Sequence, residues 1–401
     1  MVMHRNFRRG FALLLAVVMV LLMWKDYGLQ GATTPPTKTT IPEDLKMDIR
    51  SLFYVQKVEK IDSLMNARPW FNGALLVAVK GVPIFSETYG YADFRRRRTI
   101  TENTPFQLAS VSKQFTAMAI MMLKEQGKVA YEDTVQRFIP SFPYKDVTVR
   151  MLLNHSAGMP NYFWLTEHKW TQPTPPSNQQ VMELLAREEP SLYFRPGSRF
   201  NYSNTNYVVL AAIVEKASHM SFGKFIEEYI FQPLGMNNSY VYSATYGHEP
   251  MGAKGYRRYG RGYREIPGTV NDGAVGDKGI YASLVDLFKW DQALYANVLV
   301  QEETLKEAFS PLVLHDKYAM RYGFGFRLQQ DEMGHVVYHN GKWNGFRTGI
   351  HRYVDEKATV IILNNTNKPG NTRIINEIED ILFRNRPPEL AALEESIENF
   401  S

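Results

Sequence analysis

Strand-forming runs stand near both ends of the chain and helical periodicity fills the middle, and this order restricts the folds open to it. Residues 74–79 and 83–89 are strand-like runs on either side of Lys80-Gly81, which predicts a β-hairpin. Turn residues separate four more runs that we expect to be strands, at 324–328, 336–339, 348–353 and 358–363.

Helical spacing of apolar residues predicts terminal helices over 48–67 and about 373–383, and helices dominate from 110 to about 240. The two ends of the chain can then share one antiparallel sheet. The sequence therefore predicts an α/β (α+β) fold, in which terminal helices flank that sheet and a mostly helical lobe, about 115–275, is inserted into it. A functional site is expected in the cleft between the lobes.

The first residues are typical of a targeting segment. Basic residues precede an unbroken apolar run over 11–24, which is short for a membrane span and fits the core of a signal peptide. No A-x-A cleavage pattern follows, so residues 1–31 predict either a signal peptide or an uncleaved anchor. Residues 32–47 are expected to form a Thr- and Pro-rich tether, 48–385 the folded domain and 386–401 a tail. We therefore expect a periplasmic or extracellular domain, with 11–24 tethering it to the inner membrane if the signal is kept.

Composition excludes several classes of protein. The chain has no Cys, which excludes disulfides, Cys nucleophiles and thiolate metal sites. Lys and Arg number 46 against 41 Asp and Glu, and the first 31 residues hold four of the former and one of the latter. The remainder is nearly neutral, which argues against a nucleic-acid partner. We expect no cofactor. We also expect no metal, because His335 and His339 lie four apart in a predicted strand, which separates them by roughly 13 Å.

Ser110 and Lys113 open a predicted helix and share one of its faces, a turn apart. A serine hydroxyl is a weak nucleophile until a base removes its proton, and a lysine amine becomes such a base when burial and nearby positive charge lower its pKa. The same S-x-x-K spacing recurs at Ser221 and Lys224. There we interpret the serine as a helix cap and the lysine as a solvated surface residue.

Tyr202 and Asn204 lie in a polar loop before an apolar helix. A phenol next to a lysine could serve as general base and later as general acid. The Asn204 amide could hydrogen-bond both the lysine amine and a substrate amide. This segment therefore supplies candidate partners for Ser110.

A third polar segment, His339-Asn340-Gly341-Lys342, ends a predicted strand. Gly341 would let substrate approach the backbone closely. The backbone N–H groups of Lys342 and Ser110 could then pair as an oxyanion hole, in which losing one donor typically costs roughly 100- to 1000-fold in rate.

These three elements, in this order, resemble the motifs of the serine β-lactamase and penicillin-binding protein superfamily, in particular its class C β-lactamase-like branch. Their surroundings resemble it too, over 104–110, 152–158 and 279–290, and the resemblance extends from about residue 49 to 383. It implies a serine hydrolase that is acylated at Ser110, moves protons through Lys113 and Tyr202, and orients substrate with Asn204.

The same resemblance implies that residues 339–342 bind substrate, and here the chain departs from typical class C lactamases, which carry Lys and Thr in place of His339 and Asn340. A histidine is fully charged only below its pKa, near 6.5 when unperturbed. The expected substrates are small molecules or peptides: D-amino-acid peptides, β-lactams or small esters. A carboxylesterase with the same site, or a slowly deacylating penicillin-binding sensor, are the alternatives.

Two basic stretches stand outside the three motifs. We interpret Arg95 to Arg98 as a solvated turn after the hairpin, with binding of an anionic envelope polymer as the alternative. Residues 256–264 interleave Tyr and Arg, a composition that could bind nucleic acid or glycan, and we interpret them as a loop bordering the cleft.

Overall fold

The computed structural model describes residues 43–246, 250–260, 262–314, 318–331 and 334–384. Residues Leu52–Pro388 make up one compact unit. The expected signal segment, most of the tether and the tail over 386–401 lie outside the described residues. Within the described ranges no helix combines the length and apolar character needed to cross a membrane.

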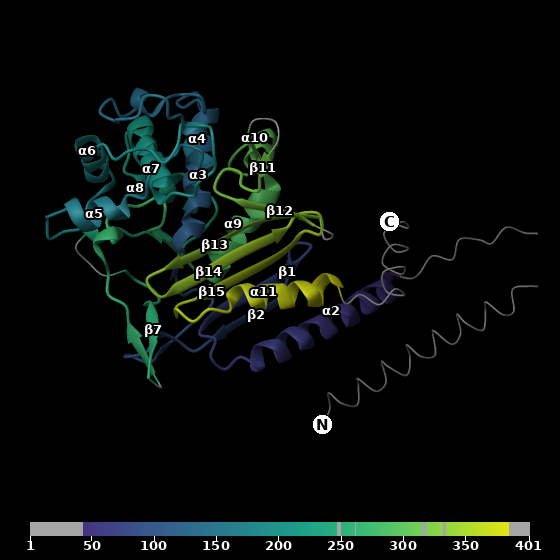
Figure 1. Ribbon diagram of the computed structural model, residues 1–401. Helices are drawn as coiled ribbons and strands as arrows, with labels where there is room; N and C mark the ends of the chain where they lie inside the picture. The colour runs from purple at the N-terminus through teal and green to yellow at the C-terminus, as the bar shows by residue number, and fades with distance from the viewer. Residues whose placement is uncertain (1–42, 247–249, 261, 315–317, 332–333, 385–401) are drawn as a thin grey trace, which may run out of the picture. The chain divides into compact units, whose positions relative to one another are not determined.

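A six-stranded antiparallel sheet joins the two ends of the chain, which confirms the predicted architecture (Figure 1). The junction is β1 against β15, with seven residue pairs from Gly73↔Asn364 to Val79↔Ala358. In spatial order the strands are β12 (Arg327–Asp331), β13 (Gly334–Trp343), β14 (Phe346–Tyr353), β15 (Ala358–Asn364), β1 (Gly73–Val79) and β2 (Val82–Tyr89).

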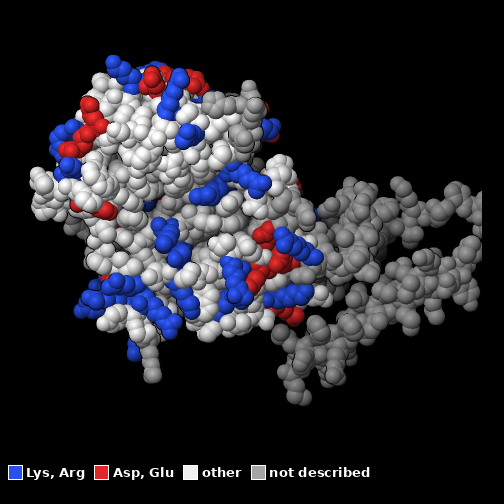
Figure 2. Space-filling view, viewed as in Figure 1, with Lys and Arg blue, Asp and Glu red and all other residues white. Residues whose placement is uncertain are grey.

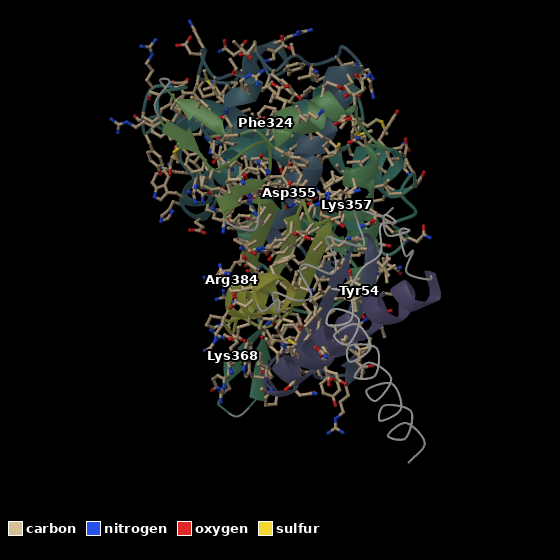
Figure 3. The ribbon with its side chains drawn as sticks, turned by 90° about the vertical axis from the view of Figure 1, so that its right-hand side faces the viewer. Tyr54, Phe324, Asp355, Lys357, Lys368 and Arg384 are labelled. Carbon is tan, nitrogen blue, oxygen red and sulfur yellow. The ribbon has the colours of Figure 1, made fainter. Side chains whose placement is uncertain are left out.

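Both faces of this sheet are buried, which explains the unbroken apolar runs in β1 and β15. Leu75 and Val77 belong to a core that includes residues of the terminal helices α2 (Glu43–Asn66) and α11 (Asn371–Glu379). Alternate residues of the same strand, such as Leu76, belong to a larger core shared with the helical part. The terminal helices therefore flank the sheet, as predicted. Figure 3 shows Tyr54 on α2, and Asp355 and Lys357 at the turn between β14 and β15.

The helical part lies on the other side of the sheet (Figure 1). Its central pair, α3 and α7, pack together, and the first two motifs lie at the N-terminal ends of these helices. The helices after β2 are α3 (Ser112–Glu125), α4 (Val149–Leu153), α5 (Phe163–Lys169), α6 (Asn178–Glu188), α7 (Asn204–Ser218), α8 (Phe222–Ile226), α9 (Leu284–Ala296) and α10 (Glu302–Ala308).

Two boundaries differ from the sequence expectation. The helices of the inserted part end with a π-turn over Glu227–Phe231, before the expected end near residue 240. Short strands follow, because alternating Tyr and Arg with Gly260 at φ +58° suit a tight hairpin better than a helix. The predicted strand over 324–328 begins only at Arg327, because Gly325 turns the chain at φ +79° against the Lys113 backbone.

The short strands form small sheets of their own. β9 (Ile280–Ala282) pairs with β5 (Phe106–Gln107) and β6 (Tyr240–Val241), and so holds the segment before Ser110. The stretch that we expected to be a loop bordering the cleft is instead the hairpin of β7 (Tyr256–Tyr259) and β8 (Gly262–Glu265). The remaining pairs are β3 (Tyr91–Asp93) with β4 (Arg98–Thr99), and β10 (Leu312–Leu314) with β11 (Tyr318–Met320).

Candidate active site

Ser110 lies in a single 3₁₀ turn, Ala109–Val111, that leads into α3. Ala109 takes φ +51°, a left-handed conformation that a residue with a Cβ adopts at a cost of roughly 1–3 kcal/mol. Its backbone N–H donates to the Gln107 side chain at 3.2 Å. Proteins retain local backbone strain of this kind at functional sites, and here it lies at the residue directly before Ser110.

Lys113 lies one turn after Ser110 and is fully buried. Its Nζ donates to Ser110 Oγ at 3.2 Å, to Asn204 Oδ1 at 2.9 Å and to the Asp277 carbonyl at 2.8 Å. The pKa of Lys113 is lowered to about 7: burial is the largest cause, the Asp277 carboxylate opposes it, and the Arg327 guanidinium adds to the lowering. A substantial share of this amine is therefore neutral near pH 7 and able to accept a proton.

The ring of Tyr202 covers the same ammonium, with Lys113 Nζ 5.0 Å from its centroid. Its hydroxyl is buried, and no described residue gives it a hydrogen bond of good geometry. Burial raises the pKa of Tyr202 well above its usual value, and the neighbouring Ser110 hydroxyl and Arg327 guanidinium offset part of the rise. The neutral phenol is thus a proton donor at rest, and Lys113 is the better resting base.

Asn204 is the first residue of α7, so the helix fixes the amide that accepts from Lys113. The other contact comes from a loop that our motif search missed, where Asp277 and Lys278 stand between Gly276 and Gly279. Gly276 takes φ +109°, and a Cβ there would lie 2.5 Å from the Tyr207 carbonyl oxygen. The two flanking glycines were the signal in the sequence that could have pointed to this loop.

Lys278 is a second buried amine beside the site. It donates to Tyr162 Oη at 2.6 Å and pairs with the Asp277 carboxylate at 3.3 Å. Burial lowers the pKa of Lys278, while Asp277 opposes the shift. The ion pair keeps the loop that contacts Lys113 in place.

His339 belongs to a chain of buried hydrogen bonds, and the donor and acceptor of each bond follow from its neighbours. His155 Nδ1 accepts from the Ser203 N–H at 3.3 Å, so its Nε2–H donates to Tyr322 Oη at 3.2 Å. The Tyr322 hydroxyl then donates to His339 Nε2 at 3.2 Å, and His339 Nδ1–H donates to the Asn340 carbonyl at 2.9 Å. This chain links the Tyr202 segment to β13.

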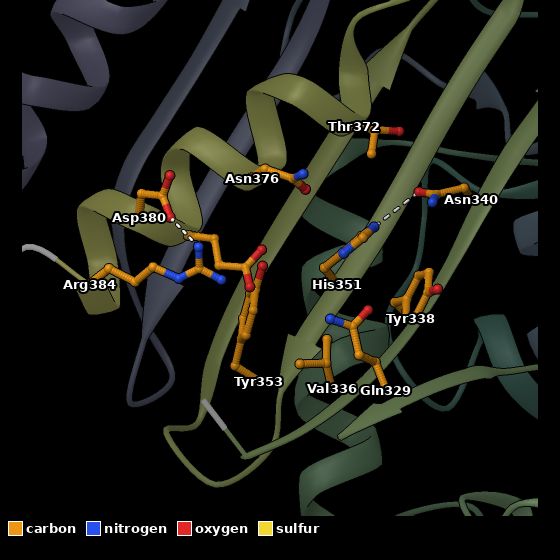
Figure 4. Close-up of a pocket in the computed structure, with 11 residues that line it drawn as sticks. Gln329, Val336, Tyr338, Asn340, His351, Tyr353, Thr372, Asn376, Asp380 and Arg384 are labelled. Carbon is orange, nitrogen blue, oxygen red and sulfur yellow. Dashed lines mark hydrogen bonds and ion pairs between the residues drawn. The ribbon is translucent and has the colours of Figure 1, made fainter. Parts of the chain in front are cut away.

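The charge expected of His339 in the third segment needs correction. His339 is 1% exposed, and burial together with the charges of Lys113 and Arg327 holds its pKa well below its usual value. It is therefore a neutral link in the sheet and does not offer a titrating charge to substrate. Asn340 accepts from His351 Nε2 at 3.0 Å beside a second cavity (Figure 4), and it also lines the cavity that Ser110 lines, so its expected contact with substrate stays a prediction. The segment forms the end of β13, which continues one residue further, to Trp343.

Gly341 is needed for a close backbone contact, besides the expected approach of substrate, which stays a prediction. A Cβ at this position would lie 2.2 Å from the Leu108 carbonyl oxygen and 2.3 Å from Thr348 Oγ1. Thr348 donates to the same carbonyl at 2.7 Å. The glycine thus lets the loop that carries Ser110 pack directly on β13. The oxyanion hole formed by the N–H groups of Ser110 and Lys342 stays a prediction.

A cavity of about 510 Å³ opens on Ser110 and Tyr202. Asn340, Gly341 and Lys342 line it from β13, and Arg327, Arg347 and Arg373 bring three further cations from other elements. No carboxylate is among the described residues that line it. The sequence reasoning missed Arg327, whose Cζ lies 5.4 Å from the Tyr202 ring centroid. The sequence feature that could have identified Arg327 is its position as a cation within a predicted strand, 12 residues before His339.

The second S-x-x-K pair is structural, as interpreted. Ser221 caps α8, with its Oγ accepting from the Lys224 N–H at 3.3 Å. Lys224 is exposed and forms an ion pair with Glu228 at 3.4 Å. His335 also has a surface partner, Asp355, at 3.2 Å. The described residues contain no group of three His, Asp or Glu placed to hold a metal ion.

Comparison with known proteins assigns the chain to a family. The sequence profile of the family described as Beta-lactamase covers residues 60–382. The chain belongs to the β-lactamase family. It is a serine hydrolase of the superfamily that also contains the penicillin-binding proteins. It is 38% identical over 327 residues to penicillin-binding protein 4* of Bacillus subtilis. The aligned region covers 78% of this chain and 72% of that protein.

Other relatives of this β-lactamase-family chain differ in their named activity. It is 26% identical over 300 residues to a D-aminopeptidase of Brucella anthropi, covering 73% of this chain and 56% of the relative. Among solved structures, the octameric penicillin-binding protein homologue from Pyrococcus abyssi has a TM-score of 0.69 at 26% identity, covering 81% of this chain and 77% of that one. FmtA from Staphylococcus aureus, at 23% identity, has a TM-score of 0.70 over 83% of this chain and 90% of that one, and shows the fold alone.

Proposed function

We propose that this protein is an exported hydrolase of the class C β-lactamase-like branch that forms an acyl-enzyme at Ser110 on substrates with a carboxylate beside the scissile amide or ester bond. One observation carries the proposal: the Ser110–Lys113 pair, at 3.2 Å, opens into a cavity with four cationic side chains and no described carboxylate. Export rests on the sequence of residues 1–31 alone.

The proposed mechanism follows from the protonation states of the two groups beside Ser110, the neutral Lys113 amine and the protonated Tyr202 hydroxyl. Neutral Lys113 accepts the hydroxyl proton while Ser110 Oγ bonds to the carbonyl carbon, and the carbonyl oxygen takes the negative charge. The backbone N–H groups of Ser110 and Lys342 are the proposed donors to that oxygen. Collapse of this intermediate breaks the bond to the leaving group, which receives a proton from the Tyr202 hydroxyl, and Lys113 reprotonates Tyr202. Water then hydrolyses the acyl-enzyme ester by the same proton transfers. Water is now the attacking group and the Ser110 hydroxyl is the leaving group.

Peptides that end in a D-amino acid are the preferred substrate class within this proposal. Their terminal carboxylate lies on the leaving-group side, where the cations of the cavity can pair with it. The similarity to penicillin-binding protein 4* supports a substrate with a carboxylate, which penicillins carry. The D-aminopeptidase relative supports a D-amino-acid substrate, although an aminopeptidase acts at the N-terminal residue. β-Lactams carry a carboxylate too and are the second class, whereas neutral esters use none of these cations.

The test compares four reporters with the full-length chain in a non-ionic detergent: a D-Ala-D-Ala peptide, the same peptide with an amidated C-terminus, nitrocefin and a p-nitrophenyl ester. We expect kcat/KM for the free acid to exceed that for its amide by at least about tenfold, the value of one charge-assisted hydrogen bond. Equal rates on the acid and the amide, with the ester turned over fastest, would assign the site to a carboxylesterase. A stable acyl-enzyme without turnover would assign it to a penicillin-binding sensor.

A further inference from the structure

A strongly basic surface lies on the β7–β8 hairpin and on the turn packed against it, outside the cavity that Ser110 lines. We call it the arginine surface. Figure 2 shows basic side chains gathered over β7. The surface consists of seven exposed arginines: Arg95, Arg96, Arg97, Arg98, Arg257, Arg258 and Arg264.

Aromatic contacts fix the turn to the hairpin. The Phe94 ring stacks on Tyr263 with centroids 4.5 Å apart and meets Tyr256 edge-on at 4.8 Å. The Phe94 N–H donates to Tyr256 Oη at 3.1 Å, and the Arg98 guanidinium donates to the Gly252 carbonyl. Two stretches that lie more than 150 residues apart in the chain thus form one preorganised surface, which reduces the entropy lost on binding.

Carboxylates offset little of this charge. Among the described residues, the ion pairs of the seven arginines amount to Arg96 with Asp93, at 4.0 Å. Asp93 is buried and accepts from the backbone N–H groups of Arg95 and Arg96. Glu265, the carboxylate of the hairpin, pairs with Lys254 at 2.9 Å. The surface therefore keeps an excess of positive charge at which a polyanion can bind with release of its counterions.

The arginines lie on both faces of the hairpin ribbon. Arg257 pairs across the strands with Arg264, and Arg258 pairs with Tyr263. Because successive residues of a strand point to opposite faces, Arg257 and Arg264 share one face and Arg258 lies on the other. A flat lipid surface meets one face of such a ribbon, whereas a flexible linear polymer can contact both.

Asn367 connects this surface to the catalytic cavity. Its Oδ1 accepts from the Arg258 N–H at 3.4 Å, and its N–H donates to the Tyr256 carbonyl at 2.9 Å. Its own carbonyl accepts from the Arg347 guanidinium at 2.9 Å, and Arg347 lines the cavity. Cationic side chains therefore extend from the hairpin to the wall of the cavity.

We propose that the arginine surface binds a linear polyol phosphate polymer, whose repeating charge is a phosphodiester, and that Arg347 leads the bound polymer toward the cavity. Each guanidinium offers a planar fork of donors that matches two phosphate oxygens. The binding does not depend on the hydrolysis proposed above, so either can fail alone.

The test measures the anisotropy of end-labelled poly(glycerol phosphate) with the full-length chain in non-ionic detergent, over a series of salt concentrations. The variant is Arg257→Glu/Arg258→Glu/Arg264→Glu. Its matched control reverses three exposed lysines of the helical part, Lys128→Glu/Lys145→Glu/Lys216→Glu, with the same change in net charge. We expect the hairpin variant to lose at least about tenfold in affinity and the log–log salt slope to shrink by about 2, while the control binds like wild type.

Turnover of a small reporter substrate and the melting temperature check that the hairpin variant is folded, and neither is expected to change. Equal losses in the two triple variants would reduce the effect to net charge and overturn the proposal. Absence of polymer binding at low salt would overturn it as well. Micelles doped with phosphatidylglycerol at the same phosphate concentration should not displace the polymer, and displacement would assign the surface to a membrane.

Discussion

The Tyr322 hydroxyl lies 3.2 Å from Nε2 of His339 and donates its proton to it. The same oxygen accepts from His155 Nε2 at 3.2 Å, and His155 in turn accepts from the Ser203 N–H next to Tyr202. One hydroxyl therefore joins the segment of Tyr202 and Asn204 to the strand that faces Ser110. The relative position of the two walls of the site depends on this link.

Replacing Tyr322 by Phe should destabilise the protein by about 1–3 kcal/mol, because it leaves a donor on His155 and an acceptor on His339 buried without a partner. Chemical denaturation measures the change. Tyr131→Phe is the matched control, since its hydroxyl is buried and has no hydrogen-bond partner among the described residues. Equal costs in the two variants would show that the link contributes nothing.

Replacing Arg327 by Gln should raise KM for a free D-Ala-D-Ala peptide roughly 10- to 100-fold, because a charge-assisted contact to its carboxylate is lost. The amidated peptide should be affected much less, and Arg327→Lys should restore part of the loss. Arg187→Gln, at an exposed helix position, is the control. Equal effects on the acid and the amide would exclude Arg327 as the carboxylate partner.

The pH profile of kcat/KM should show an acid limb near pH 7. Lys113 is the proposed base and acts only when neutral, so activity rises as pH increases through its pKa of about 7 and then reaches a plateau. Arg327→Gln should move this limb to higher pH, because the Arg327 charge lowers the pKa of Lys113. A limb near pH 6.5 that disappears in His339→Gln would instead identify His339 as the titrating group.

Gly341→Ala should reduce kcat strongly, because the new methyl group would overlap the Leu108 carbonyl and displace the loop of Ser110. The melting temperature should fall as well. Gly262→Ala, where a Cβ would have its nearest described neighbour at 4.0 Å, is the control and should retain full activity. Wild-type kcat in Gly341→Ala would mean that the loop does not need its contact with β13.

The sequence predicted the features that rest on local periodicity. Alternation and apolar runs identified the strands that meet at β1 and β15, and the chemistry of Ser110 with Lys113 follows from a spacing of three within a helix. Ser221 was separated from Ser110 by its capping context, and its hydrogen bond to the Lys224 N–H agrees with that interpretation.

Features that depend on tertiary burial were beyond the sequence. His339 sits in a strand pattern that looks half-exposed, and its neutrality comes from packing against Tyr322 and the helices. The role of Gly341 depends on Leu108, more than 200 residues away in the chain. Arg327 enters the cavity only because β12 pairs beside β13, which brings it to Tyr202.

Acylation followed by peptide mass mapping tests the central claim most directly. A fluorescent penicillin or a fluorophosphonate is incubated with the wild-type chain, with Ser110→Ala and with the control Ser221→Ala, which should cost only about 0.5–2 kcal/mol of stability as a lost helix cap. We predict that the label lies on Ser110 in the wild type and in Ser221→Ala, and that Ser110→Ala neither takes up label nor turns over substrate. A label on Ser221, or full turnover by Ser110→Ala, would contradict the mechanism.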